Sequence, residues 1–233
     1  MEKEIQKILF LHGFASSGQC VKAQYLEKKF QARPAEFHAV DLNPTPRDFE
    51  YMTTTGLINR VRQYVLDHDL ERISIIGSSY GGLIALRYAH RFGGVEKMLL
   101  LAPALTWLSG GLDEEALAGW RQTGVAPVYH YAFERELPVR YELQADGLGY
   151  LEPVPPAAPT TIIHGCNDKT VPIEPSRAYA ADFPYLVHLI EIDADHDLND
   201  HLDYVWKYVQ FFLLDTEQGR CSETTPHFPS IFT

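Results

Sequence analysis

The chain has 233 residues, a length that one hydrophobic core can serve, with 45% hydrophobic and 22% charged residues. This composition is that of a soluble globular protein and argues against a disordered chain. The formal net charge of -11 argues against nucleic-acid binding, which requires clustered Lys and Arg to neutralise phosphates.

Targeting signals and metal-binding patterns are missing from the sequence. No apolar run approaches membrane-spanning length, and Ile8 to Leu11 is too short and too early for the apolar part of a signal peptide. The cysteines, Cys20, Cys166 and Cys221, are odd in number and widely spaced, which argues against a disulfide framework or a four-cysteine metal site. We expect a cytoplasmic protein with no membrane partner, no metal and no cofactor, and make no prediction of its oligomeric state.

Six short apolar runs alternate with segments of helical periodicity. This is the pattern of parallel strands linked by crossover helices. We therefore predict an α/β fold with a doubly wound, mainly parallel sheet of about six strands, built from residues 1–102 and 160–214. The predicted strands are 7–11, 36–42, 72–76, 97–101, 160–164 and 186–192.

Helices are predicted between and after these strands. Val21, Tyr25 and Lys29 lie at helical spacing, although the lysine makes this stripe imperfect, and a second stripe covers 57–65. Residues 80–92 directly follow the third strand and end at a Gly-Gly pair, which is typical of a helix terminus. The last helix, about 200–214, has one apolar face that should pack against the sheet.

Residues 103–159 interrupt the alternation and are predicted to form a cap insertion. Residues 112–120 have helical spacing, whereas apolar residues alternate at period two over 129–133 and again over 139–143. A helix followed by a small hairpin is the prediction. The tail, 215–233, is polar and without periodicity.

A nucleophile is predicted at the turn after the third strand. Gly77-Ser78-Ser79-Tyr80-Gly81 matches G-x-S-x-G between a buried strand and a helix, where a serine hydroxyl is exposed on a strained turn. The flanking glycines let strand and helix approach closely. Ser79 is the predicted nucleophile; Ser78 lacks the glycine frame, and a glycine-rich turn without catalytic function is the alternative.

A serine needs a base, and parallel sheets place ligands at the carboxyl ends of their strands. His196 follows the last predicted strand and is the predicted general base, with His201 as the second choice. Asp168 follows the preceding strand and would orient the imidazole, unless it only bonds its own turn. The order Ser79, Asp168, His196 agrees with a chain order known for serine hydrolases.

The oxyanion of a tetrahedral intermediate needs two donors. The backbone N–H groups of Phe14, after the first strand, and Tyr80, after the nucleophile, are the predicted pair. For His12 we expect support of this loop rather than a chemical role.

Four motifs together resemble the α/β-hydrolase superfamily: the strand followed by HGF, GSSYGG, HGxxDxxVP and the late DHD. More narrowly, HGFASS with Lys22-Ala23 shortly after it resembles the small bacterial YqiA-like esterases. The resemblance implies a metal-free serine carboxylic-ester hydrolase whose functional positions are Ser79, Asp168, His196, Phe14 and Tyr80. Only six strands are readable, so the first two strands of the full superfamily sheet are expected to be missing.

Aromatic residues of the insertion are candidates for an apolar substrate pocket, namely Trp107, Trp120, Tyr129 and Tyr131. They could equally pack the insertion onto the body. The expected substrate is a small-molecule ester or thioester.

Three other functions remain open. An acyl thioesterase would use the same triad and favour basic residues near the pocket mouth. A silent binding protein would keep the fold without the chemistry. The acidic cluster 193–201 could in principle hold a metal, although a solvated loop explains it more simply.

Overall fold

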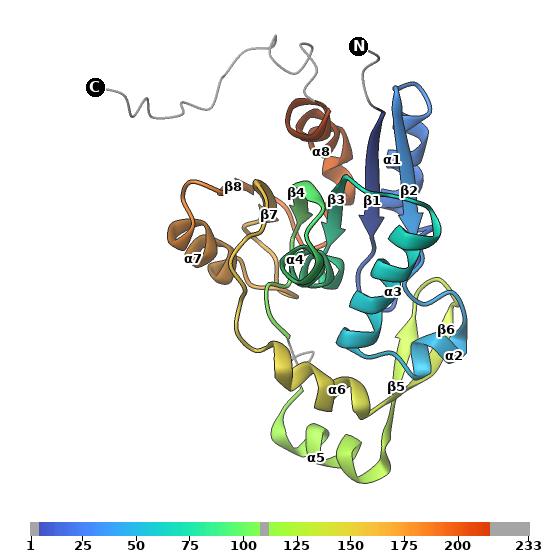
Figure 1. Cartoon of the computed structure of the whole chain (residues 1–233). Coiled ribbons are helices and arrows are strands. Elements are labelled where there is room, and N and C mark those ends of the chain that lie inside the picture. The colour runs from blue at the N-terminus through green and yellow to red at the C-terminus, as the bar shows by residue number, and fades with distance from the viewer. Residues whose placement is uncertain (1–4, 108–111, 215–233) are drawn as a thin grey trace.

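The computed structural model of the chain describes residues 5–107 and 112–214. Six parallel strands form one sheet in the order β2-β1-β3-β4-β7-β8 (Figure 1). All six predicted strands are confirmed, with ends shifted by at most two residues. They are β1 (Gln6–Leu11), β2 (Ala35–Val40), β3 (Ile73–Ser78), β4 (Val95–Leu101), β7 (Thr160–Gly165) and β8 (Val187–Ile192).

The central strands are buried on both faces, which is why they consist of continuous apolar runs. Every residue of β3 and of β7 is buried. Strand β2 pairs with one edge of β1, and the chain then crosses over so that β3 pairs with the other edge of β1. The crossovers therefore diverge between β1 and β3, and such a switch point opens a crevice at the carboxyl ends of the strands.

Helices cover both faces of the sheet. Helix α1 (Val21–Phe30) and α8 (Leu202–Tyr208), which continues as a π-helical turn (Val209–Leu213), share one apolar cluster with the sheet. Helices α3 (Thr54–Asp67), α4 (Tyr80–Phe92) and α7 (Glu174–Asp182) contribute to the cluster on the other face. The predicted packing of the last helix against the sheet is confirmed.

The predicted apolar stripe of α1 is wrong, although the helix exists. Val21 is 58% exposed, and the buried face consists of Ala23, Leu26 and Phe30. Phe30 meets Trp206 of α8 edge to face, with ring centroids 5.2 Å apart. The rotation of the helix about its axis is thus set by aromatic packing from the far end of the chain.

The segment between β4 and β7 contains the predicted helix followed by a hairpin. Helix α5 (Glu114–Thr123) precedes the antiparallel strands β5 (Val125–His130) and β6 (Arg135–Arg140), then α6 (Glu142–Gly147) and a 3-10 turn (Leu148–Tyr150). Both strands of the hairpin begin four residues earlier than predicted, so that Tyr131 and Phe133 lie in its turn and Leu143 belongs to α6. Figure 1 places this segment, with the short α2 (Pro46–Glu50), beyond the carboxyl ends of the strands.

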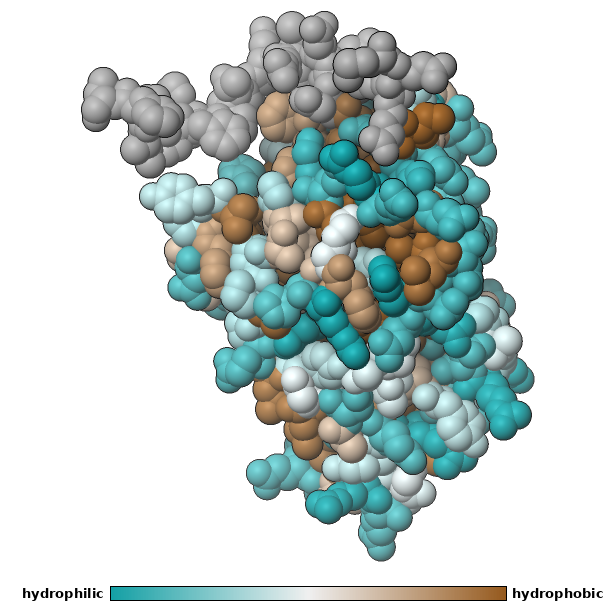
Figure 2. Space-filling view, viewed as in Figure 1, coloured by the Kyte–Doolittle hydropathy of each residue, from teal (hydrophilic) through white to brown (hydrophobic). Residues whose placement is uncertain are grey.

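Most apolar residues are buried in the core, and the surface is correspondingly polar. The face seen in Figure 2 is largely hydrophilic, and hydrophobic side chains reach it in separate areas. Across the described ranges, none of the helices combines the length and apolar character that crossing a membrane requires.

Candidate active site

The turn from β3 to α4 has a strained backbone at Ser79. Its φ of 53° and ψ of -120° lie in a region that residues with a side chain rarely adopt. The turn is held from both sides, because the Ser79 amide donates to Leu101 O at 2.9 Å and the Ser79 carbonyl accepts from Gly82 N at 2.8 Å. Strain of this kind persists only where the surrounding structure fixes it.

The glycines of the motif are required by close backbone contacts. A Cβ at Gly77 would lie 2.8 Å from the carbonyl oxygen of Gly81. A Cβ at Gly81 would overlap the carbonyl oxygens of Leu11 and His12, at the end of β1. The close approach of strand and helix predicted from the sequence is therefore present, and the turn also packs against the loop after β1.

Three predicted residues, each following a different strand, form one hydrogen-bonded chain. His196 Nε2 lies 2.9 Å from Ser79 Oγ, and His196 Nδ1 lies 2.7 Å from Asp168 Oδ2. Because a carboxylate can only accept, Nδ1 carries the proton, and Nε2 presents its lone pair to the serine hydroxyl. The hydroxyl contact is made by His196 and not by His201, which lies in the 3-10 turn before α8.

Asp168 is enclosed and held as an anion. Its side chain is fully buried, and Oδ1 accepts backbone hydrogen bonds from Thr170 and Val171, both at 2.9 Å. Burial by itself raises the pKa of this carboxyl, but the amide of Val171, the hydrogen bond from His196 and the attraction of its imidazole together hold the pKa below the ordinary value. The group is therefore ionised at neutral pH.

The loop after β1 lies against the serine. An added Cβ at Gly13 would be 3.3 Å from the Cβ of Ser79. His12 fixes this loop, because its Nδ1 donates to Gly13 O at 2.8 Å and its Nε2 accepts from the amide of Leu42 at 2.9 Å. The imidazole is fully engaged with backbone, as expected for a supporting residue.

The predicted oxyanion donors belong to this loop and to the first turn of α4. Among the turn and loop hydrogen bonds of the described chain, neither the amide of Phe14 nor that of Tyr80 is used. Their rings meet edge to face with centroids 6.0 Å apart, and the Tyr80 hydroxyl bonds Thr54 Oγ1 at 2.9 Å. Both amides are thus carried by anchored residues beside Ser79.

Ser79 and His196 open into a cavity of about 1090 Å³. Tyr129 and Tyr131 line it, as two of the four aromatic residues proposed from the sequence, and both are exposed. Two basic residues, Lys22 and Lys169, line it as well. The other members of the lining are Gly13, Phe14, Ala15, Ser16, Cys20, Val21, Ser78, Val128, Asn167, Thr170, Asp195, Asp197 and Asn199.

A family model matches residues 7–213, nearly the whole chain. It describes an uncharacterised protein family, UPF0227. The chain belongs to UPF0227. A search of curated proteins found no match to it.

Solved structures similar to this UPF0227 protein are α/β hydrolases. Alpha/beta hydrolase domain-containing protein 10 from mouse superposes with a TM-score of 0.71 at 20% identity, covering 92% of each chain. Est1E from Butyrivibrio proteoclasticus, with ferulic acid bound, gives 0.70 at 18%, covering 91% of this chain and 89% of that one. A monoacylglycerol lipase from Paleococcus ferrophilus gives 0.69 at 14%, covering 90% and 95%. At these identities the likeness establishes an α/β-hydrolase fold.

Two of the aromatic residues proposed for the pocket lie in the core of this UPF0227 protein instead. Trp107 and Trp120 are each 8% exposed and line no part of the cavity at Ser79. Trp107 donates to Gln144 Oε1 and Trp120 to the carbonyl of Val139, both at 2.9 Å. These two tryptophans therefore pack the segment between β4 and β7 rather than line the substrate cavity, and their indole N–H groups find hydrogen-bond acceptors within that segment.

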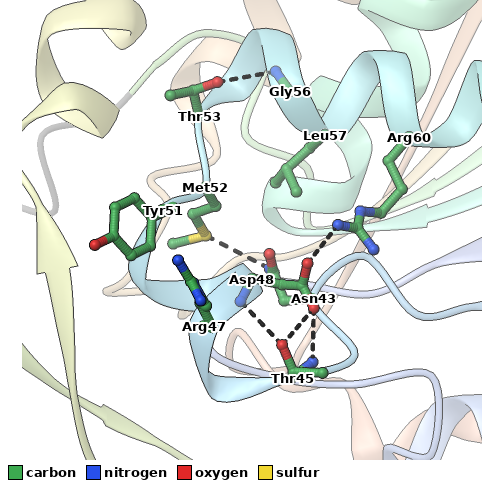
Figure 3. Close-up of a pocket in the computed structure, with 10 residues that line it drawn as sticks. All are labelled: Asn43, Thr45, Arg47, Asp48, Tyr51, Met52, Thr53, Gly56, Leu57 and Arg60. Carbon is green, nitrogen blue, oxygen red and sulfur yellow. Dashed lines mark hydrogen bonds and ion pairs between the residues drawn. The ribbon is translucent and has the colours of Figure 1, made fainter.

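A second, smaller cavity of about 360 Å³ lies beside α2 and the start of α3 (Figure 3). Its polar groups are hydrogen-bonded to each other. The carboxylate of Asp48 accepts from Thr45 and Arg60, and the hydroxyl of Thr53 accepts from the amide of Gly56 at the start of α3. Ser79 and His196 are not part of this cavity. Within the described ranges, no three His, Cys, Asp or Glu side chains are arranged to hold a metal ion.

Proposed function

We propose that this UPF0227 protein hydrolyses carboxylic esters, with Ser79 as nucleophile, His196 as general base and Asp168 as the acid that orients it. The observation that carries the proposal is the continuous hydrogen-bonded chain from Ser79 Oγ to Asp168 Oδ2 at the strained turn. The fold supports it, since a monoacylglycerol lipase and an esterase from Rhodococcus are among the similar structures.

The reaction follows from the tautomer of His196. Ser79 Oγ attacks the ester carbonyl carbon while its proton passes to Nε2, and the new charge on Nδ1–H and Nε2–H is balanced by Asp168. The amides of Phe14 and Tyr80 donate to the oxyanion. Collapse expels the alcohol, which takes the proton from Nε2 and leaves an acyl-serine, and a water molecule then reverses the sequence to release the acid.

The cavity wall suggests which part of the substrate is recognised. Phe14, Val128, Tyr129 and Tyr131 provide apolar surface next to the serine, suited to an acyl or aryl group. Tyr129 and Tyr131 meet edge to face with centroids 5.5 Å apart, and the amide of Tyr131 donates to Ala15 O at 3.0 Å. The hairpin turn is therefore tied to the loop that carries the predicted oxyanion donor.

A thioesterase is the second candidate, because two lysines face this cavity. Burial lowers the pKa of Lys22, and attraction to Cys20, Asp197 and Asp195 only partly opposes that effect. Lys22 and Lys169 could attract the phosphates of acyl-coenzyme A. Rates on aryl esters of increasing acyl length, compared with acyl-coenzyme A, distinguish the two candidates: a preference for the thioester that Lys22→Met abolishes would favour the second.

A fluorophosphonate probe tests the nucleophile. Ser79→Ala should lose labelling and lower ester hydrolysis on the order of 10³-fold or more, whereas the adjacent Ser78→Ala should keep both. Labelling that persists in Ser79→Ala and disappears in Ser78→Ala would move the nucleophile by one residue. A wild-type protein that neither labels nor hydrolyses esters or thioesters would favour the silent binding protein.

A further inference from the structure

A second histidine contacts the carboxylate of Asp168. His164, the residue before the end of β7, is completely buried, and its Nε2 lies 3.1 Å from Asp168 Oδ2 and 2.9 Å from Val171 O. On the other side of the ring, Nδ1 lies 2.9 Å from the hydroxyl of Ser176, which is also completely buried on α7. The same oxygen of Asp168 that receives His196 therefore faces two imidazoles.

The partners of His164 determine its tautomer. Both neighbours of Nε2 are acceptors, a carboxylate oxygen and a carbonyl oxygen, so Nε2 must carry a proton. In the neutral ring Nδ1 then has a lone pair, and the hydroxyl of Ser176 donates to it. Ser176 thereby holds the donor side of His164 toward Asp168.

We propose that His164 is a positioning residue of the triad: its Nε2–H fixes the Asp168 oxygen that orients His196, and Ser176 keeps that proton on Nε2. The inference rests on the proposed function of Ser79, His196 and Asp168. His164 touches none of the reacting atoms and acts only through Asp168.

The backbone amides alone leave the carboxylate a degree of freedom. Thr170 and Val171 both donate to Oδ1, so they anchor one oxygen and leave the other able to swing about it. Without His164, Oδ2 would be held only by His196, the group that it is supposed to orient. A second donor from the rigid strand β7 removes that motion and keeps the negative charge opposite Nδ1 of His196.

A matched pair of substitutions separates this function from simple packing. His164→Met fills the space without a donor, and His164→Gln can place an amide N–H near the original Nε2. We expect His164→Met to lower kcat about 10- to 100-fold with KM within about twofold of wild type. The acid limb of its kcat/KM profile should move about half a pH unit or more toward lower pH, because a misplaced Asp168 stabilises the imidazolium less. His164→Gln should recover most of both properties.

Several results would overturn the proposal. A folded His164→Met with the kcat and pH profile of wild type would do so, and so would equal losses in the Met and Gln variants, since the donor would then be irrelevant. If His164→Met does not fold, Ser176→Ala replaces it: a smaller shift of the acid limb in the same direction supports the proposal, and an unchanged profile refutes it.

Proton NMR of the resting protein keeps this test independent of the proposed function. The imidazole N–H groups of His196 and His164 that bond Asp168 should give two downfield signals. Asp168→Asn should remove the signal of His196 and shift that of His164, whose proton keeps Val171 O as an acceptor, and His164→Met should remove one signal and shift the other. An unshifted remaining signal refutes coupling through Asp168 even if esters are not substrates. Hydrolysis that survives Ser79→Ala refutes the proposed function without changing this spectrum.

Discussion

Replacing Asp168 by Asn should remove nearly all activity while leaving the protein folded. The loss is expected because four hydrogen-bond donors converge on this one carboxylate. Two are the backbone amides of Thr170 and Val171 on Oδ1, and two are the imidazoles of His196 and His164 on Oδ2. An amide side chain has only one acceptor oxygen, so it cannot satisfy both pairs.

The size of the loss in kcat depends on which of the four donors can change the position of its proton. A backbone N–H cannot move its proton, so the Asn oxygen should remain on the two amides and its NH2 group should face the imidazoles. His196 can then accept that N–H only by moving its own proton from Nδ1 to Nε2, which leaves Nε2 without a lone pair for Ser79. We expect a loss of about 10⁴-fold in kcat, or about 5.5 kcal/mol. The mismatch that remains at His164 should cost about 1–3 kcal/mol of stability.

Steady-state hydrolysis of an aryl ester and urea unfolding followed by circular dichroism measure the two quantities. Asp193→Asn is the matched control, because Asp193 is exposed, accepts a hydrogen bond from Asn167 at 2.7 Å and keeps an acceptor oxygen when it becomes Asn. Its activity should stay within about twofold and its stability within about 0.5 kcal/mol. An Asp168→Asn protein with more than about a tenth of wild-type kcat would refute the tautomer argument.

Four other substitutions test separate parts of the structure. Gly81→Ala should lower both kcat and the unfolding midpoint, because its Cβ overlaps carbonyl oxygens at the end of β1; Gly119→Ala, an exposed site on α5 with open space around it, should instead stabilise by about 0.5–1 kcal/mol. Burial lowers the pKa of His130, so its contribution to stability is present above about pH 6.5 and lost below it; as the pH is lowered from 8 to 5, the melting temperature should fall less steeply in His130→Phe than in wild type, and an unchanged slope would contradict this. Tyr129→Ala should raise KM for aryl esters several-fold with little change in kcat, because the ring lines the cavity and binds the substrate before reaction. A fall in kcat as large as the fall in kcat/KM would instead mean that the ring stabilises the transition state.

The local features of the candidate site were predictable because they depend on neighbours in the chain. The buried strands were visible as continuous apolar runs, and the turn at Ser79 was visible because its glycines are needed for backbone contact. The positions of Asp168 and His196 followed from the rule that strand ends gather at one edge of a parallel sheet.

The contact of His164 with Asp168 was not predicted, although both residues belong to the HGxxD motif. Spacing along the chain does not say whether a strand residue turns its ring toward the following loop or away from it. Here α7 supplies Ser176, which holds the ring in place. The buried face of α1 was missed for a similar reason, since Trp206 comes from a distant helix.

The sequence by itself determined where the strands lie along the chain, the strained serine turn and the three candidate groups at strand ends, since each follows from short-range patterns of volume and polarity. Only the tertiary structure decided which aromatic rings face the cavity and which are buried. Trp107 and Trp120 are in the core while Tyr129 and Tyr131 line the cavity. The physical reason is that burial of a side chain is decided by surfaces brought together from distant parts of the chain, and those surfaces exist only after folding.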